Sequence, residues 1–250
     1  MNSAVKEVKK PLRRLLRAWA VLVLLILAVF LMGWKGLLWF NMPSKSRYPV
    51  RGVDVSHYQG KIDWEKIASQ DIRFAFIKAT EGSASSDEYF SANWQGARKA
   101  GLKTGAYHFF SFDSPAETQA DNFIAAVPAE PDALPPVIDL EYYRKGEHPS
   151  ADAVRNSLRT LLDRMKAAYG KKPVIYTSES CYENYLKDSG LDYTLWIRSV
   201  YSRPSDEYQP AWTFWQYNPC GRLEGYTGEE GRIDLNAYCG SISDFQREFG

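Results

Sequence analysis

Four carboxylic acids lie within short apolar runs that have the composition of β-strands. Asp139 and Glu141 occur in the run Val-Ile-Asp-Leu-Glu-Tyr, and Asp54 and Asp234 occur in similar runs near the start and the end of the body of the chain. Because side chains alternate along a strand, Asp139 and Glu141 are expected on the same face. Two acids held close together in a poorly solvated site cannot both ionise easily, so one pKa rises and supplies a general acid near neutral pH. Paired carboxylates of this kind point to hydrolysis of a glycosidic bond.

A purely structural role is the alternative for these acids, in which each one caps a loop or pairs with a buried arginine. Four such acids on three strands favour a shared site instead. Other catalytic arrangements fit the sequence less well. His57, His108 and His148 are too few and too scattered for a zinc site, and neither an HExxH nor a CxxC motif occurs. We therefore expect no metal and no cofactor, and we expect His108 to be a core or supporting histidine.

An alternation of strand-like and helix-like segments must position these acids. Five strand-helix units are followed by three strands joined by loops, which predicts an α/β fold with parallel strands closed into a TIM-like (β/α)5(β)3 barrel. An open, doubly wound sheet is the alternative, but the first strand lacks the glycine-rich phosphate loop that such folds usually carry. The predicted strands are 52–57, 74–80, 104–110, 136–142, 174–178, 195–200, 213–217 and 233–237.

Closure of the barrel brings the first and last strands together. Asp54 and Asp234 are then expected beside Asp139 and Glu141 at the C-terminal mouth of the barrel. The neighbouring aromatic and amide residues are candidates for substrate binding, because the C–H faces of sugar rings pack on aromatic rings. Trp215 and Gln216 are adjacent on one strand, so they cannot both face the same side. The candidates for substrate binding are Tyr107, Tyr176, Trp215 and Gln216.

The first fifty residues differ in charge from the remainder of the 250-residue chain. They hold nine Lys or Arg and one acid, whereas the rest holds 22 basic and 29 acidic residues. An acidic body argues against a nucleic-acid-binding domain, which would carry its basic patch on the folded part. Residues 18–34 contain no charged side chain, and a second apolar stretch follows Lys35.

This apolar segment predicts a transmembrane signal anchor over residues 18–40, since about 20 residues are needed to cross the hydrocarbon layer. The basic segment 1–17 is expected in the cytoplasm by the positive-inside rule. A cleaved signal peptide is the alternative, but no small-x-small cleavage site follows the apolar run. Residues 41–50 are predicted to be a linker, and residues 51–250 are predicted to form the barrel. Either interpretation exports the barrel from the cytoplasm.

Three cysteines remain to be placed. In an oxidising compartment Cys220 and Cys239 could pair and close the loop between the last two strands, which would leave Cys181 free. The alternative is that all three are buried thiols.

The body of the chain resembles glycoside hydrolase family 25, the Chalaropsis-type lysozymes. The resemblance extends from Arg51 to about Gly240 and depends on eight segments that occur in the same order as in that family. These segments are GVDVSHYQGKIDW (52–64), FAFIKATEG (74–82), GLKTGAYHFF (101–110), PPVIDLEYY (135–143), KKPVIYTS (171–178), TLWIRSVY (194–201), WTFWQYNPCGRLEGYTG (212–228) and RIDLNAYCG (232–240).

The resemblance implies a β-1,4-N-acetylmuramidase that cuts peptidoglycan between N-acetylmuramic acid and N-acetylglucosamine. It also implies a (β/α)5(β)3 barrel. Within its motifs, Glu141 corresponds to the proposed general acid and Asp139 to the first acid of the D-x-E pair. Asp54 and Asp234 correspond to two further active-site acids. Tyr107 and Tyr176 correspond to tyrosines that line the substrate groove.

One position departs from the family pattern. The sixth strand usually has alanine after Leu-Trp-Ile, whereas this chain has Arg198. An arginine that points into the groove would change how the sugar is bound or would pair with an acid. The expected partners are peptidoglycan glycan strands and a bacterial inner membrane, crossed once, with the barrel in the periplasm or outside the cell. The alternatives are a non-catalytic peptidoglycan-binding scaffold and a hydrolase of another N-acetylated glycan such as chitin.

Overall fold

The computed structural model describes residues 2–34, 39–143 and 148–250. The chain divides into two compact units, Met1–Phe40 and Asn41–Gly250. Helix α1 (Asn2–Trp34) makes up most of the first unit. Its segment Arg14–Gly33 has a mean hydropathy of 2.7 and is long and apolar enough to cross a membrane. Residues 35–38, which belong to the predicted span 18–40, lie outside the described residues.

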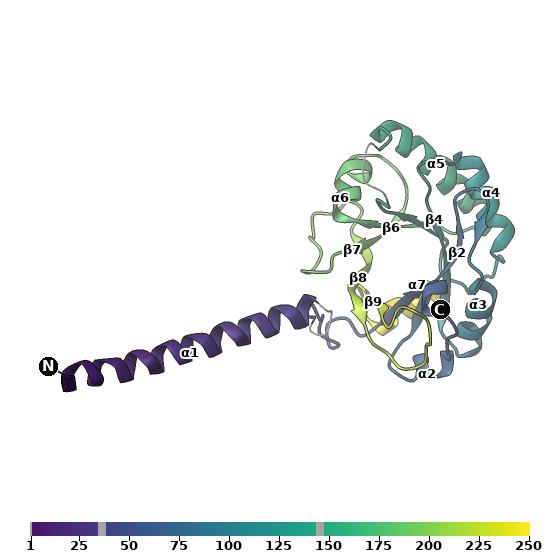
Figure 1. Ribbon diagram of the computed structural model, residues 1–250. Helices are drawn as coiled ribbons and strands as arrows, with labels where there is room; N and C mark the ends of the chain where they lie inside the picture. The colour runs from purple at the N-terminus through teal and green to yellow at the C-terminus, as the bar shows by residue number, and fades with distance from the viewer. Residues whose placement is uncertain (1, 35–38, 144–147) are drawn as a thin grey trace. The chain divides into compact units, whose positions relative to one another are not determined.

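Eight strands of the second unit close into a barrel, which confirms the predicted fold class (Figure 1). The order around the barrel is β1-β9-β8-β7-β6-β5-β4-β2, and β1 pairs with β2 to close it. A short strand, β3 (Ser85–Ser86), adds to β2 and was not predicted. The barrel strands are β1 (Arg51–Val55), β2 (Phe74–Glu81), β4 (Lys103–Phe109), β5 (Val137–Leu140), β6 (Val174–Ser178), β7 (Thr194–Arg198), β8 (Trp212–Gly221) and β9 (Ile233–Tyr238).

The last strand differs in direction from the prediction of an all-parallel barrel. β9 runs antiparallel to both β8 and β1. The physical reason is the connection before it, because residues 222–232 are fewer than the dozen or so residues that a parallel crossover requires. The reversal places the start of β9, and with it Asp234, at the same end of the barrel as the C-termini of the parallel strands.

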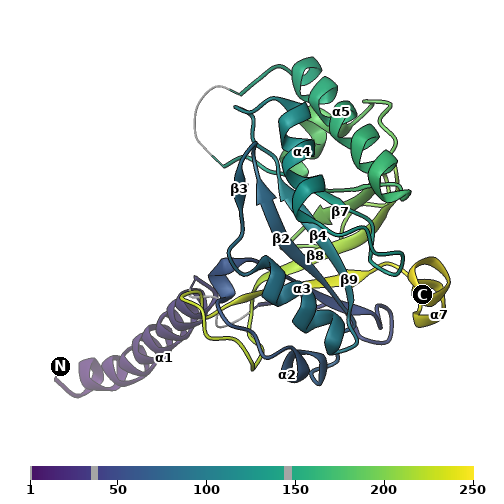
Figure 2. The same ribbon diagram turned by 90° about the vertical axis from the view of Figure 1, so that its right-hand side faces the viewer.

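Helices cover the outer face of the barrel, and Figure 2 shows α3 and α4 alongside β2 and β4, with α5 next to α4. The longest of them, α5, buries one apolar stripe that includes Leu158 and Met165. It ends at Gly170, whose φ of 65° is left-handed and therefore favours glycine. The helices of this unit are α2 (Trp64–Ala68), α3 (Phe90–Lys99), α4 (Ala116–Ala126), α5 (Ala151–Tyr169), α6 (Glu179–Cys181) and α7 (Ile242–Phe249), with a 3-10 turn at His57–Gln59 and a π-turn at Tyr182–Leu186.

Two apolar clusters hold this architecture together. One lies between the barrel and its helices, and the other fills the barrel itself. Inside the barrel, Phe76 stacks on Trp196 with ring centroids 4.5 Å apart. Room for Phe76 comes from Gly105 on the next strand, where a Cβ atom would lie 2.6 Å from the Phe76 ring. Helix α7 closes the far end of the barrel by packing Phe245 against Phe74.

Residues 41–50 pack against the barrel within the same compact unit. Tyr48 and Val50 are buried, and the Asn41 amide donates to the backbone carbonyls of Ser199 and Ser202 at 3.1 and 3.2 Å. This segment therefore fixes the loop that follows β7.

The predicted disulfide between Cys220 and Cys239 is wrong. Along the β8–β9 pair, the amide of Cys239 donates to Thr213, whereas Gly221, next to Cys220, pairs with Ile233. The two cysteines are thus at opposite ends of β8, roughly 20 Å apart at about 3.3 Å per residue, whereas a disulfide needs Cα atoms within about 7 Å. The alternative of three buried thiols is also wrong, because of the three only Cys181 is buried.

Candidate active site

A cavity of about 190 Å³ opens at the mouth of the barrel, where the parallel strands end and β9 begins. All four predicted catalytic acids line this cavity, and three of the four predicted substrate-binding residues do so as well. The lining residues are Asp54, Val55, Ser56, Tyr58, Gln59, Lys78, Tyr107, Phe109, Asp139, Glu141, Tyr176, Gln216, Glu230 and Asp234.

Asp54 and Asp234 face each other across the pair of strands that closes the barrel. They are direct partners in the β1–β9 register, and their carboxyl groups share a hydrogen bond. Burial raises the pKa of both groups, and the charge of Asp54 raises the pKa of Asp234 further. Two carboxyl groups this close cannot both ionise easily, so the pair is suited to sharing one proton.

Two amide side chains hold the Asp54 carboxylate in place. Asn236 Nδ2 donates to Asp54 Oδ2 at 2.7 Å, and Gln216 Nε2 donates to the same oxygen at 3.0 Å. The orientation of each amide follows from its other neighbour. Trp196 Nε1 can only donate and contacts Asn236 Oδ1 at 2.9 Å, while the Tyr176 hydroxyl donates to Gln216 Oε1 at 3.0 Å.

This arrangement makes Gln216 a bridge between the closing strands and the substrate cavity, because Gln216 Nε2 also lies 3.2 Å from Asp234 Oδ2. Replacing Gln216 by Leu removes the donor and raises the pKa of both acids still further. We expect the free energy of unfolding to fall by about 1–3 kcal/mol near neutral pH. The loss should grow as pH rises, because the fold must then retain protons that the unfolded chain releases.

Urea unfolding of the purified chain at pH 5 and pH 8 measures this effect of Gln216→Leu. The matched control is Gln95→Leu on the exposed side of α3, which should leave unfolding unchanged at both pH values. An equal loss at the two pH values would contradict the assigned role of Gln216 as a donor to the two carboxyl groups.

Asp139 is a strongly perturbed acid near the centre of the mouth. Its side chain is 8% exposed, and Oδ1 is buried without a hydrogen-bond partner in the described part of the chain. Burial raises its pKa well above the usual value, and the charges of Glu141 and Asp54 raise it further. The Lys78 ammonium opposes this shift. A carboxyl group kept unpaired in a buried position is a costly feature that points to a functional site.

Glu141 lies immediately after the end of β5, one residue beyond Leu140, and is partly exposed to the cavity. Burial raises its pKa, and Asp54 adds to the increase, whereas the Arg198 guanidinium lowers it. The predicted strand 136–142 is therefore shorter in the structure. Glu141 nevertheless remains on the cavity side with Asp139, as alternation predicts.

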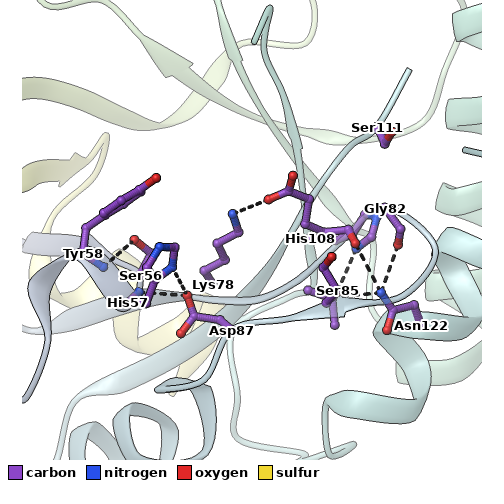
Figure 3. Close-up of polar contacts among 12 residues, drawn as sticks. Ser56, His57, Tyr58, Lys78, Gly82, Ser85, Asp87, His108, Ser111 and Asn122 are labelled. Atoms are coloured by element: carbon purple, nitrogen blue, oxygen red, sulfur yellow. Dashed lines mark hydrogen bonds and ion pairs between the residues drawn. The ribbon is translucent and has the colours of Figure 1, made fainter. Parts of the chain in front are cut away.

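Ordered polar contacts hold the cavity wall near β1 and β2. Lys78 Nζ lies 2.7 Å from Glu81 and 4.9 Å from the centre of the Phe109 ring. Figure 3 shows His57 turned toward Asp87, whose buried carboxylate contacts His57 Nδ1 at 3.0 Å and its backbone amide at 2.8 Å. These contacts fix the turn that carries Tyr58 at the edge of the cavity.

His108 supports the opposite part of this wall and does not face the cavity. Its Nδ1 atom lies 2.7 Å from the Thr80 hydroxyl, and its Nε2 atom lies 3.1 Å from Gln119. Burial lowers the pKa of His108 to about 4, so the ring is neutral at physiological pH. Gln119 in turn binds the backbone of Ser111 and Ser114, and so the histidine holds the loop after β4. The interpretation of His108 as a supporting residue is confirmed.

The structure contradicts substrate binding by Trp215. Its side chain is 2% exposed and lies outside the barrel, where Nε1 donates to the Ser199 carbonyl at 2.7 Å and the ring packs edge-on against Tyr48. Alternation explains the difference, since Gln216 points inward and its neighbour must point outward.

Several residues that build the cavity were not among the predicted site residues. Asn236 and Trp196 orient Asp54, and Lys78 opposes the charge of Asp139. The signal used for the acids applies to Lys78 and Asn236 as well, because both are polar residues within otherwise apolar strands. Glu230 belongs to a long loop, and no strand pattern could have placed it.

The closed barrel and its carboxyl cluster define the class of this protein. A concave site with four acids, of which Asp139 is buried and the others are half-buried, is lined by tyrosines and amides. It is suited to protonating a glycosidic oxygen and stabilising positive charge on a sugar ring. This is the arrangement of a glycoside hydrolase. Residues 53–226 match the family model of glycosyl hydrolases family 25.

Individual relatives agree with this match. The structure of a family 25 glycosyl hydrolase from Bacillus anthracis is 46% identical, with a TM-score of 0.78, and the alignment covers 83% of this chain and 97% of that one. Lysozyme M1 of Streptomyces globisporus is 35% identical over 208 residues, or 78% of this chain and 69% of that protein. N,O-diacetylmuramidase of Arthroderma benhamiae is 32% identical over 212 residues, or 79% and 86%. The chain belongs to glycoside hydrolase family 25.

Proposed function

We propose that this chain is a membrane-anchored lysozyme that hydrolyses the β-1,4 bond between N-acetylmuramic acid and N-acetylglucosamine in peptidoglycan. The observation that carries the proposal is the single cavity shared by Asp54, Asp139, Glu141 and Asp234. Relatives that are named lysozyme and N,O-diacetylmuramidase support peptidoglycan as the substrate.

Glu141 is proposed as the general acid. Its pKa is raised by burial, so a proton stays on the carboxyl group at a higher pH than in water. Glu141 gives this proton to the glycosidic oxygen as the bond from that oxygen to the anomeric carbon breaks, and the oxygen leaves as the new hydroxyl group of N-acetylglucosamine. Water then supplies the hydroxyl group of the new reducing end.

Asp139 is proposed to stabilise the positive charge that develops on the sugar ring, or to orient the N-acetyl group that can attack the anomeric carbon from within the substrate. Its unpartnered Oδ1 supports this role, because the atom is buried without a hydrogen bond in the described chain. Asp54 and Asp234 are proposed to tune the acid pair or to position water. Tyr107, Tyr176 and Gln216 are proposed to bind the sugar.

Helix α1 is proposed to anchor the enzyme in a bacterial inner membrane, with the barrel on the outer side. The segment Arg14–Gly33 supports this location by its length and hydropathy. The basic residues before it support a cytoplasmic N-terminus. An anchored enzyme of this kind is suited to remodelling the wall of its own cell.

The experiment compares two substrates. The full chain, purified in detergent micelles, is incubated with isolated peptidoglycan sacculi and with chitin oligomers. Release of soluble fragments from sacculi at a higher rate than cleavage of chitin would support the proposed substrate. Preferential cleavage of chitin would overturn it, and retention on sacculi without any cleavage would favour a non-catalytic scaffold.

The pH dependence of the reaction follows from the raised pKa of Glu141. A general acid must be protonated, so kcat/KM should fall as pH rises through this pKa, and the fall should occur at a higher pH than an exposed glutamate would give. Initial rates on soluble glycan strands between pH 4 and pH 9 measure the profile. An activity that rises throughout this range would contradict the assignment of Glu141 as the acid.

A further inference from the structure

Arg198 is the cation at the mouth of the barrel that departs from the family pattern. It is the last residue of β7, and it lies opposite Gln216 on one side and Ser178 on the other. Residues in direct register on neighbouring strands share a face of the sheet. Because Gln216 points to the inner face, the Arg198 side chain leaves the strand on that same face, at the mouth.

The Arg198 guanidinium makes no hydrogen bond or ion pair with any residue in the described ranges 39–143 and 148–250. It instead lines a second cavity, of about 300 Å³, between the loops that follow β6 and β7. Four serine residues, Ser178, Ser180, Ser199 and Ser202, line the same cavity. A half-buried guanidinium with free donors beside several hydroxyl groups has the chemistry of a site for an anion with planar oxygens.

The wall of this second cavity is held by a network of its own. The Ser199 hydroxyl donates to the Glu179 carboxylate at 2.7 Å. Among the described residues that line this cavity, Glu179 is the acidic one. The Ser199 carbonyl accepts from Trp215 and from Asn41, and the Ser202 carbonyl also accepts from Asn41. These bonds direct Glu179 to Ser199, and they leave the Arg198 guanidinium available for a ligand.

Arg198, which lines the second cavity, is in register with Gln216, which lines the catalytic one. Arg198 is close enough to the acid cluster to lower the pKa of Glu141, Asp54 and Asp234. A group attached to a sugar in the catalytic cavity can therefore reach Arg198. In peptidoglycan the substituent that branches from the glycan strand is the lactyl group of muramic acid, which ends in a carboxylate or continues into a peptide stem with carboxylates of its own.

We propose that Arg198 and its serine-lined cavity bind a carboxylate on the lactyl or peptide substituent of muramic acid. This inference rests on the proposed function, since it requires a muramic acid residue in the catalytic cavity. Arg198 is thus a specificity residue that favours anionic muramic acid over neutral N-acetylglucosamine at the same position.

Binding of matched ligands tests this proposal without depending on turnover. The full chain in detergent micelles carries Glu141→Gln, and its affinity is measured calorimetrically for muramic-acid-containing tetrasaccharides. One ligand has free lactyl carboxylates and a second has peptide stems. A third and a fourth are the same molecules with every carboxylate converted to a methylamide. The comparison between a charged ligand and its methylamide isolates the contribution of the charge.

The measured quantity is the ratio of affinities for a charged ligand and its methylamide. Adding Arg198→Ala should lower this ratio by about 10-fold or more, as expected for the loss of a charge-assisted hydrogen bond. Arg198→Lys should keep part of the preference. Arg73→Ala, before β2 at the opposite end of the barrel, is the matched control and should leave the ratio unchanged. The ratio is compared for the lactyl ligand and the peptide-stem ligand. The ligand whose ratio falls further in Arg198→Ala carries the carboxylate that Arg198 binds.

An unchanged ratio in Arg198→Ala, with both folded proteins verified by circular dichroism, would overturn the proposal. An equal loss for the charged and methylamide ligands would do the same, because it would indicate general damage to the groove. A wild-type chain that binds charged ligands through Arg198 but hydrolyses none would refute the proposed hydrolysis and leave this inference standing.

Discussion

Replacing Glu141 by Gln is expected to lower kcat/KM on peptidoglycan by about 10²–10⁴-fold, which is the usual contribution of a general acid. The substitution keeps the size and the hydrogen-bonding shape of the side chain and removes the proton that the leaving oxygen needs. Because the raised pKa of Glu141 sets the pH at which activity falls, its replacement should also abolish the fall in activity at alkaline pH. Initial rates on soluble glycan strands over a range of pH measure both effects.

The matched control is Glu65→Gln on the exposed surface of α2, which should retain full activity. Thermal unfolding should show that Glu141→Gln remains folded. A folded Glu141→Gln variant with activity within about 10-fold of the wild type would contradict the role of Glu141, since even a modest general acid contributes more than that.

Replacing Asp139 by Asn is expected to change activity and stability in opposite directions. Activity should fall by about 10²–10³-fold, because the variant cannot carry the negative charge that stabilises the transition state. Stability at neutral pH should rise. The pKa of Asp139 is higher in the folded state than in the unfolded chain, so the wild-type fold loses stability as pH rises from about 4 through the raised pKa. Asparagine does not titrate and removes this loss.

Thermal unfolding at pH 4 and pH 8 tests the sign of this effect. The melting temperature of Asp139→Asn should be close to that of the wild type at pH 4 and higher at pH 8. Asp163→Asn, on the exposed face of α5, is the control and should shift neither value. A variant that is less stable than the wild type at pH 8 would contradict the description of Asp139 as a buried, unfavourably placed acid.

The acid cluster could be predicted from the sequence because two simple rules apply to it. A carboxylate in an apolar strand needs a reason to be there, and alternation assigns it to one face. These rules brought Asp139 and Glu141 together, and closure of the barrel added Asp54 and Asp234. Their predicted convergence is what the structure contains, with Asp54 and Asp234 in direct register.

Other features depend on directions and distances that a strand pattern does not contain. Asp234 reaches the mouth because β9 is antiparallel, and this direction follows from a connection that is too short for a parallel crossover. The predicted Cys220–Cys239 disulfide is wrong for a related reason. Both cysteines lie on the strands that flank one loop, but the sequence does not fix the register of those strands, which holds the two cysteines apart. Trp215 and Gln216 are adjacent, so one of them had to face outward. The structure shows that it is Trp215.

The hydrogen bonds that orient the catalytic acids could not be predicted from the sequence either. Asp54 is oriented by Asn236 and Gln216, which are in turn oriented by Trp196 and Tyr176. These five residues come from five different strands, so no local motif connects them. The directions of these hydrogen bonds can be assigned only when the structure places the indole of Trp196 and the hydroxyl of Tyr176 beside the amides.

The central claim is that this chain cleaves the bond on the reducing side of muramic acid by means of Glu141. The most direct test digests purified sacculi with the full chain, reduces the products with borohydride and identifies their reduced ends by mass spectrometry. We expect muramitol ends from the wild type and almost none from Glu141→Gln. Glucosaminitol ends from the wild type, or muramitol ends produced equally well by both proteins, would contradict the account.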